Sequence, residues 1–549
     1  MEIKIEKLSN RIIAYCSGKL DSQTGPMLES EVNPLISEDL HPVILDLSGV
    51  TYISSAGIRS LIHLMKSSLT KEINSDFAKR NTVRIVNAKG NVRNILMLSN
   101  LDAAISRIRP KTNDNLQLSE SYQELIEKVR KMFPSPKSNK EMDDNFVNTI
   151  SKVLEVLDSM KTDKPYLGIR KPLDYDSAKL SKIPEKLATI DECINIVSDF
   201  MNGVMIWGHP RTQENVMPPS SIPSIIGNLY GSIYNPNILT EELSYGLSLA
   251  EVDAAAMLAE LAGYDPVESA GFSTFGGTGT IFYGVKIGLE KAYPGTFING
   301  LKESPVIVAS HASHYAKLSA VGWLGIGLNN FIAVPADGDN SMDIIELEKT
   351  LREIIESNRK IACIIATMGS TDAFGIDNIE YIYKLRDKLV EEYKLDYTPH
   401  IHADAVIGWA WLFFKDYDFD RNPMGFPPRT LRSLWDTIVN LSALNCADSF
   451  GVDFHKTGYG PYISSMVIIK SKLDLNLISR KTESMPYLFQ FGHYHPGIFT
   501  METSRSGGAV LVAVANLKTF GKEGYRAIIG HIVTRSEERR VGKECRSRW

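Results

Sequence analysis

The stretch Cys446-Ala-Asp-Ser-Phe-Gly-Val-Asp-Phe-His-Lys-Thr-Gly-Tyr459 places a lysine, Lys456, directly after a histidine and between two apolar segments. The apolar segment behind it, residues 463–469, predicts a short strand, so we expect Lys456 on a loop beside a sheet. A lysine held against apolar walls loses its hydration, which disfavours the ammonium and leaves an amine able to attack a carbonyl. A lone His-Lys pair is more often part of a polar surface turn, so the rest of the chain has to decide between the two interpretations.

Strand and helix signals alternate from about residue 224 onward, which predicts an α/β fold with a mostly parallel sheet and helices on both faces. The unbroken apolar run at residues 361–367 predicts a fully buried strand of that sheet. Polar or glycine-rich segments at residues 271–280, 310–317 and 400–407 fall at predicted strand ends. Because ligands of open α/β sheets bind where strands end and loops begin, we expect these segments to form the site.

These segments carry residue types that suit a phosphorylated aromatic ring. The turn with Gly277 and Thr278 precedes a predicted helix, whose first N–H groups can bind a phosphate. His314 can stack on a flat ring, and Asp404 can keep a ring nitrogen protonated. Each feature alone is more often structural, as a turn, a core histidine or a helix cap. Their occurrence together, in one order along the chain, is what indicates a site.

That order resembles the group II decarboxylases that depend on pyridoxal 5'-phosphate (PLP), the family of glutamate, aromatic-amino-acid and tyrosine decarboxylases, over about residues 207–532. The resemblance implies a large domain of the PLP-dependent transferase fold type I, with PLP as cofactor and a homodimer with the cofactor near the subunit interface. It implies that Lys456 binds the cofactor aldehyde covalently, that Asp404 pairs with the ring nitrogen and that His314 stacks on the ring. The other cofactor-binding residues that it implies are Gly277 and Thr278 at the phosphate, helped by Ser449, then Thr371 beside the ring hydroxyl, and His455 next to the lysine.

The activity that the resemblance implies is removal of the carboxylate of an L-amino acid as carbon dioxide, leaving the amine. The substrate is expected to carry an aromatic or an acidic side chain, and the Gly-Tyr-Gly-Pro-Tyr run ending at Tyr462 is similar to that of bacterial tyrosine decarboxylases. Tyr487 is a candidate proton donor to the reacting carbon, or alternatively a loop aromatic in a dimer interface. The alternatives are a PLP-dependent carbon–carbon lyase or aminotransferase, and a signalling protein with an inactive PLP module.

Residues 1–108 predict a separate small α/β domain with an amphipathic helix at residues 57–68. The two serines shortly before this helix can cap it through their hydroxyls, which requires no further function. The segment at residues 45–61 also resembles the signature of STAS domains of the anti-sigma-factor antagonist type. The resemblance implies that Ser55 is a phosphorylation site and that the domain binds a regulatory protein partner, because a phosphate at a helix N-terminus changes how partners dock.

A polar linker at residues 109–145 is expected to connect this domain to a PLP-dependent decarboxylase-like domain at residues 146–534. The C-terminal small domain of that fold is expected to be incomplete, because the segment after Lys456 is short for a full domain. Residues 535–549 form an unpatterned basic run that resembles the translation of a sequencing adapter, and we interpret them as a non-native tail. A natural basic tail is the alternative.

A net charge of -5 over 549 residues gives no general attraction to nucleic acid or to anionic membranes. The five cysteines are far apart in sequence, which indicates free thiols in a reducing compartment. The N-terminus has no hydrophobic signal segment, and no apolar run approaches the ~20 residues that span a bilayer. We therefore expect a cytoplasmic protein that binds neither nucleic acid nor membrane, without a metal site, because its histidines show no ligand spacing.

Overall fold

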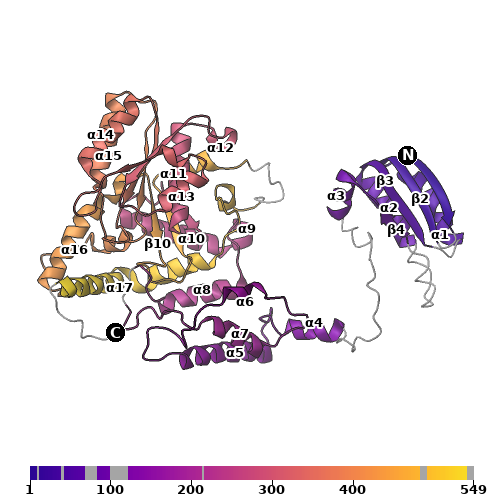
Figure 1. Cartoon of the computed structure of the whole chain (residues 1–549), viewed down its shortest axis with the longest axis horizontal. Coiled ribbons are helices and arrows are strands. Elements are labelled where there is room, and N and C mark those ends of the chain that lie inside the picture. Colours follow the sequence, from indigo (N-terminus) through magenta and orange to yellow (C-terminus); the bar gives the residue numbers. More distant parts are fainter. Residues whose placement is uncertain are drawn as a thin grey trace. The chain divides into compact units, whose positions relative to one another are not determined.

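The computed structural model of the chain describes residues 1–8, 11–38, 42–67, 83–98, 122–212, 216–481 and 491–540. The chain divides into two compact units, Met1–Ile126 and Glu127–Trp549 (Figure 1). Two helices begin inside the predicted linker, α4 (Tyr122–Arg130) and α5 (Lys140–Ser159). The part of the predicted linker before Tyr122 lies outside the described residues.

The first unit packs helices against a four-stranded sheet. Its elements in chain order are β1 (Glu2–Leu8), β2 (Arg11–Leu20), α1 (Gly25–Glu38), β3 (Val43–Ile53), α2 (Ser55–Ser67), β4 (Val83–Val86) and α3 (Gly90–Leu98). The strand order is β1-β2-β3-β4, antiparallel between β1 and β2 and parallel between the other neighbours. Ile12, Ala14 and Cys16 of β2 alternate into the core, because successive side chains of a strand point to opposite faces. This unit has the small α/β fold expected at the N-terminus.

The second unit is built on a seven-stranded sheet. Its strands are β5 (Ala270–Thr274), β6 (Val306–Ser310), β7 (Phe331–Val334), β8 (Ile361–Thr367), β9 (His400–Asp404), β10 (Ser449–Asp453) and β11 (Ser465–Ile469). They lie in the order β5-β11-β10-β9-β8-β6-β7. All neighbours from β10 to β7 are parallel, and β11 is antiparallel to β10 and to β5. The prediction of a mostly parallel sheet is confirmed.

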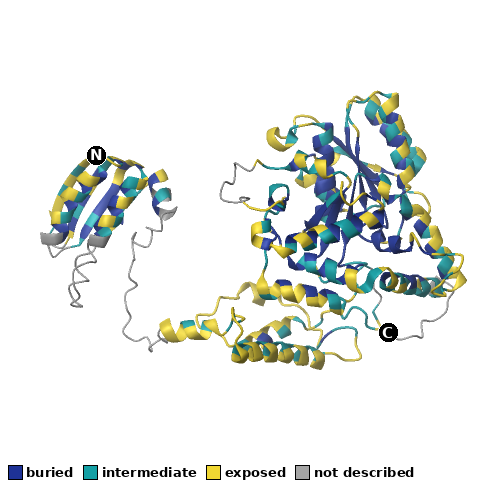
Figure 2. Ribbon diagram, turned by 180° about the vertical axis from the view of Figure 1, so that it is seen from behind, coloured by how far each residue is buried: buried dark blue, intermediate teal, exposed yellow. Residues whose placement is uncertain are grey.

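Helices bury both faces of this sheet. The remaining α-helices are α6 (Tyr175–Lys179), α7 (Ile190–Phe200), α8 (Ile222–Tyr234), α9 (Glu241–Ser244), α10 (Gly246–Ala262), α11 (Gly277–Ala292), α12 (Thr296–Asn299), α13 (Ala316–Trp323), α14 (Ile344–Glu356), α15 (Ile379–Glu392), α16 (Pro428–Leu441) and α17 (Gly508–Arg540). Short 3-10 helices lie at Leu328–Asn330, Gly408–Phe414, Ser442–Cys446, Lys472–Ile478 and Pro496–Ile498. Ile307 of β6 packs in one core with α11 and α13, and Val308 packs in another with α10, α14 and α15. Burial on both faces explains the unbroken apolar strands, which are dark blue in Figure 2.

The C-terminal helix α17 contains a break at Gly521, whose φ of 55° lies in the left-handed region that glycine adopts without strain. The helix continues past residue 534, where the sequence predicted a junction, and residues 541–549 lie outside the described residues. Among the helices that the structure describes, none combines the length and the apolar character needed to cross a membrane.

Candidate active site

A cavity of about 340 Å³ lies at the edge of the large sheet where three parallel strands end. Thr367, Asp404 and Asp453 are the last residues of β8, β9 and β10, and all three line this cavity. Because the carboxyl ends of parallel strands meet at one edge of a sheet, residues far apart in sequence converge there. This is the position at which the sequence predicted a site.

The first turn of α11 forms one wall of the cavity, with Gly277 and Thr278 among the lining residues. Gly276 precedes the helix with a φ of 120°, and no side chain in the described part of the chain caps it. The first backbone N–H groups of such a helix form a binding position for an anion. A Cβ atom at Gly277 would lie 2.8 Å from Oδ2 of Asp453 and 3.0 Å from Cγ1 of Val406, so the wall leaves room for glycine only.

Lys456 lies on the loop after β10, and its side chain is 15% exposed. Its Nζ atom is 3.0 Å from Oδ2 of Asp453, which is itself buried. Burial alone lowers the pKa of Lys456, but the carboxylates of Asp453 and Asp404 raise it above its ordinary value. The expectation that apolar walls leave a free amine is therefore corrected, because the amine keeps its proton in a buried ion pair. The signal was present in the sequence, since Asp453 stands just before Phe-His-Lys in the opening stretch.

Asp404 ends β9 and is 5% exposed. Its Oδ1 atom is buried and has no hydrogen-bond partner among the described residues. Burial raises the pKa of Asp404 to about 6, while the positive charge of Lys456 acts in the opposite direction. A buried carboxylate oxygen without a partner is costly, so the arrangement suits a ligand that offers a cationic N–H group.

His314, Thr371 and His455 also line the cavity. Nδ1 of His314 accepts a hydrogen bond from the backbone N–H of Ala316 at 3.2 Å, which fixes the ring at the start of α13. Burial, followed by the charge of Lys456, lowers the pKa of His314, so its ring is neutral near pH 7. The ring centroids of His455 and Tyr462 lie 4.1 Å apart. Tyr462 also lines the cavity, although the sequence did not predict it there.

One predicted site residue, Ser449, does not line this cavity. Ser449 begins β10 at the opposite end from Asp453, a separation of about 13 Å along a strand of this length. Its hydroxyl lies instead 2.8 Å from Nε2 of His400 and 2.8 Å from Nδ1 of His402. Tyr487 lies outside the described residues, so its position stays a prediction.

A second cavity of about 450 Å³ shares Lys456 and Thr371 with the first. The rings of Trp411 and Phe374 line it with their centroids 4.3 Å apart. Asp372 is the one acidic residue among the described residues that line this second cavity. Lys456 is the one lysine or arginine among them. The two cavities therefore share the candidate reactive amine, and the second offers an aromatic wall.

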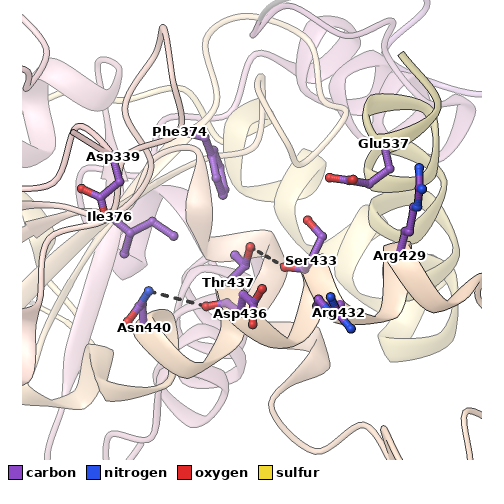
Figure 3. A pocket seen from close by; sticks show the side chains of 11 residues that line it. Asp339, Phe374, Ile376, Arg429, Arg432, Ser433, Asp436, Thr437, Asn440 and Glu537 are labelled. Carbon is purple, nitrogen blue, oxygen red and sulfur yellow. Dashed lines mark hydrogen bonds between the residues drawn. The ribbon is translucent and has the colours of Figure 1, made fainter. Parts of the chain in front are cut away.

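A third cavity of about 560 Å³ lies along α16 (Figure 3). Figure 3 shows its charged rim, in which Arg429, Arg432 and Asp436 project from that helix. It shares Phe374 with the second cavity, but none of the site residues predicted from sequence lines it. A large volume alone is not evidence that this cavity takes part in the chemistry. We therefore assign the candidate site to the two cavities that Lys456 lines.

In the first unit, Ser55 is the first residue of α2 and is exposed. The hydroxyl of Ser54 accepts a hydrogen bond from the backbone N–H of Gly57 at 3.3 Å, so Ser54 has the capping role. A Cβ atom at Gly57 would lie 2.3 Å from the carbonyl oxygen of Leu20, which explains the glycine there. The Ser55 hydroxyl therefore remains at the surface, at the N-terminus of a helix.

No group of three or more metal-ligating side chains is close enough to hold a metal ion in the parts of the chain that the structure describes.

Comparison with protein families gives two matches. Residues 171–545 match the pyridoxal-dependent decarboxylase conserved domain, which is more than half of the chain. Residues 2–117 match the STAS domain. The two matched segments follow one another along the chain in the order that the motifs predicted.

Among characterised proteins, the L-tyrosine decarboxylase of Enterococcus faecium is 30% identical over 233 residues, which cover 40% of this chain and 37% of that enzyme. The L-2,4-diaminobutyrate decarboxylase of Acinetobacter baumannii is 23% identical over 357 residues, which cover 62% of this chain and 64% of that enzyme. The chain therefore matches less than two thirds of the length of either relative.

Among solved structures, the glutamate decarboxylase domain of the diaminobutyrate-pyruvate transaminase and L-2,4-diaminobutyrate decarboxylase from Vibrio parahaemolyticus has a TM-score of 0.59 at 18% identity, covering 75% of this chain and 80% of that one. Oryza sativa TDC with PLP and tryptamine has a TM-score of 0.57 at 15% identity, covering 72% of this chain and 77% of that one. At these identities the likeness establishes the fold, which is fold type I of the PLP-dependent enzymes.

Proposed function

This chain belongs to the family of pyridoxal-dependent decarboxylases, and we propose that it releases the α-carboxylate of an L-amino acid as carbon dioxide, with PLP bound at Lys456. The observation that carries the proposal is that Lys456 and Asp404 line one cavity of about 340 Å³. A PLP enzyme needs an amine at the aldehyde end of the ring and a carboxylate at its nitrogen end. The first turn of α11 at the same cavity offers the phosphate position.

The residues of the cavity fit PLP. Oδ1 of Asp404 has no partner among the described residues, and a protonated ring nitrogen would provide one. The phosphate would accept hydrogen bonds from the backbone N–H groups of Gly277 and Thr278 in the first turn of α11, whose residues line the cavity. His314 would stack on the ring, and Thr371 would lie at the side of the ring hydroxyl. His455 completes the lining next to the lysine.

PLP, when bound, supplies an electron sink for the charge left on Cα as the carboxylate departs. The chain's own side chains orient and charge the site. Asp404 would keep a proton on the ring nitrogen, and Lys456 would hold the cofactor at its aldehyde end. His314, whose pKa is lowered by burial so that the ring is neutral near pH 7, would pack against the ring without competing for the charge. Tyr487 stays the predicted donor of the proton that Cα receives.

We infer that the substrate has an aromatic side chain. The second cavity, beside Lys456, presents the rings of Trp411 and Phe374, and aromatic groups pack well against such rings. An acidic side chain would need a cation, and Lys456 is the one lysine or arginine among the described residues of that lining. Similarity to an L-tyrosine decarboxylase is consistent with this class.

Product analysis tests the reaction. The chain, loaded with PLP and given L-tyrosine, is expected to release carbon dioxide and amine in equal amounts. Lys456→Ala is expected to abolish both products and the visible absorbance of the bound cofactor, whereas Lys470→Ala, at an exposed lysine, is expected to change neither. Keto acid without carbon dioxide would favour an aminotransferase, and cleavage of another bond would favour a carbon–carbon lyase.

A substrate screen tests the specificity separately. Aromatic L-amino acids are expected to give kcat/KM values at least about tenfold above those of L-glutamate and L-aspartate, a difference of about 1.4 kcal/mol in transition-state binding. Faster turnover of an acidic amino acid would contradict the aromatic class and leave decarboxylation standing.

We propose that the chain forms a homodimer. α8 presents Ile222, Ile225, Leu229 and Tyr230 along one face, and these side chains are 74%, 50%, 42% and 60% exposed. A contiguous apolar helix face of this kind is typical of a protein interface. Light scattering is expected to give twice the chain mass of 61.1 kDa, and a monomer at micromolar concentration would contradict the proposal.

We propose a cytoplasmic location. The four cysteines in the described residues, Cys16, Cys193, Cys363 and Cys446, are unpaired, as is usual in a reducing compartment. Fractionation of cells that produce the chain is expected to recover it with cytoplasmic markers, and recovery with secreted proteins would contradict this location.

We propose that the first unit binds a regulatory protein and that Ser55 controls the binding. The match to the STAS domain and the exposed position of Ser55 at the start of α2 support this role. A phosphate there adds negative charge at a helix N-terminus. Mass spectrometry of the chain from its own cells is expected to find phosphate that is lost in Ser55→Ala and kept in Ser54→Ala. A protein that never shows cofactor absorbance would instead favour a signalling role for the whole chain.

A further inference from the structure

Asp453 is the acid closest to the candidate reactive amine. It ends β10, is 1% exposed, and its Oδ2 atom lies 3.0 Å from Nζ of Lys456. The hydroxyl of Ser465 donates a hydrogen bond to Oδ1 at 2.6 Å. One carboxylate oxygen is therefore held by β11, and the other is directed at the lysine.

The surroundings of Asp453 make Lys456 its charge partner. Nε2 of His455 lies 3.4 Å from the same Oδ2 atom, but burial lowers the pKa of His455, so this ring is neutral near pH 7. The other titratable groups that act on the charge of Lys456 are Asp404 on β9 and Tyr462 on the following loop, and Lys456 in turn acts on His314. Asp453, unlike Asp404 and Tyr462, is in direct contact with the ammonium of Lys456.

The carboxylate of Asp453 is also fixed in place from the side of α11. A Cβ atom at Gly277 would come within 2.8 Å of Oδ2 and 3.1 Å of Oδ1, so this carboxylate packs against the backbone of the first helical turn. A side chain confined between Gly277, Ser465 and Lys456 has little freedom to turn away. The ion pair is therefore a built feature of the site.

We propose that Asp453 is the counter-ion of Lys456 and keeps this amine protonated whenever it is not bonded to the cofactor. A buried ammonium without a counter-ion is costly, because removing one partner of a buried ion pair leaves the other charge uncompensated. An ammonium has no lone pair and cannot attack a carbonyl, so Lys456 displaced by substrate stays an acid and not a competing nucleophile. This role rests on the proposed function and adds a positioning residue to it.

The pH dependence of covalent PLP capture tests the proposal. The full chain is mixed with PLP between pH 6 and 11 and reduced with borohydride, and the adduct on Lys456 is quantified by peptide mass. Asp453→Asn is expected to move the midpoint of trapping to lower pH by about one unit or more, because the opposite charge no longer favours the ammonium. Asp420→Asn, which removes an exposed acid that lines neither cavity, is expected to leave the midpoint unchanged.

The outcomes separate the two proposals. Equal midpoints in Asp453→Asn and the unchanged chain would overturn the counter-ion role and leave the decarboxylase proposal intact. Absence of any adduct on Lys456 of the unchanged chain would contradict the proposed function itself. If Asp453→Asn does not fold, competitive acetylation of the lysines in the unchanged chain tests the counter-ion role instead. Lys456 must then become reactive at higher pH than the exposed Lys472, and reactivity at the same or lower pH would overturn the proposal.

Discussion

The side chains of His402 and Ser449 meet across the neighbouring parallel strands β9 and β10, with Nδ1 of the ring 2.8 Å from Oγ of the serine. His400 reaches the same hydroxyl with Nε2, also at 2.8 Å. A hydroxyl between two ring nitrogens donates to one and accepts from the other, which suits two neutral rings, and Nε2 of His402 is buried without a hydrogen-bond partner among the described residues. Burial lowers the pKa of His402 to about 3, and the pKa of His400 is also lowered.

This network predicts a loss of stability in acid. The pKa of His402 is about 3 in the folded state and about 6.5 when unfolded, so between these values only the unfolded chain binds the proton. The buried neutral ring of His402 makes its full contribution to the free energy of unfolding above pH 6.5. As the pH falls below this value, the free energy of unfolding decreases by about 1.4 kcal/mol per pH unit for this one ring. Urea unfolding of the second unit at several pH values measures it. His402→Gln is expected to flatten the acid slope, and the exposed His493→Gln to leave it unchanged. Equal slopes in all three chains would contradict the prediction.

Gly277→Ala is expected to weaken PLP binding by at least about tenfold, equivalent to about 1.4 kcal/mol. The added Cβ atom would lie 2.8 Å from Oδ2 of Asp453 and 3.0 Å from Cγ1 of Val406, so the wall of the phosphate position must move. Gly322→Ala is the matched control, because nothing lies within 4 Å of a Cβ atom there. A titration followed by absorbance gives both affinities, and equal values would show that this turn does not hold the phosphate.

PLP affinity is expected to fall as the pH drops from 7 to 5. Burial raises the pKa of Asp404 to about 6 in the empty site, so below that pH the carboxyl is protonated and cannot hold a protonated ring nitrogen. Asp404→Asn has no charge to lose, so its affinity is expected to be weak and nearly independent of pH in this range. Titrations at pH 5, 6 and 7 check the difference. An identical pH dependence in the variant would assign the effect to another group.

Lys317→Met is expected to lower the free energy of unfolding of the second unit by about 2–3 kcal/mol. The ammonium of Lys317 is buried and donates to the carbonyl oxygen of Ser310 at 2.6 Å and to the carbonyl and hydroxyl oxygens of Ser313 at 3.0 and 2.6 Å. These contacts hold the turn that leads to His314. Urea unfolding measures the loss, with the exposed Lys302→Met as control, and a variant as stable as its control would contradict the prediction.

The sequence does not predict a side-chain environment that depends on strand register. Ser449 was expected at the phosphate because it lies in the lysine motif, but the pairing of β10 with β9 sets it opposite His402, 47 residues away in sequence. The protonation of Lys456 was misjudged for a related reason. Apolar neighbours in sequence suggested a free amine, whereas the loop after β10 folds its Nζ atom back onto Asp453.

By itself, the sequence determined the class of fold and the order of the site segments, because short unbroken apolar runs such as residues 361–367 suit strands buried on both faces. It also determined which residue types stand at the strand ends, among them Asp404 and Lys456. Only the tertiary structure decided the electrostatics of the site. The charge of a buried group depends on which carboxylate reaches it within a few ångströms, and that distance is set by strand register and by the close packing of α11 at Gly277.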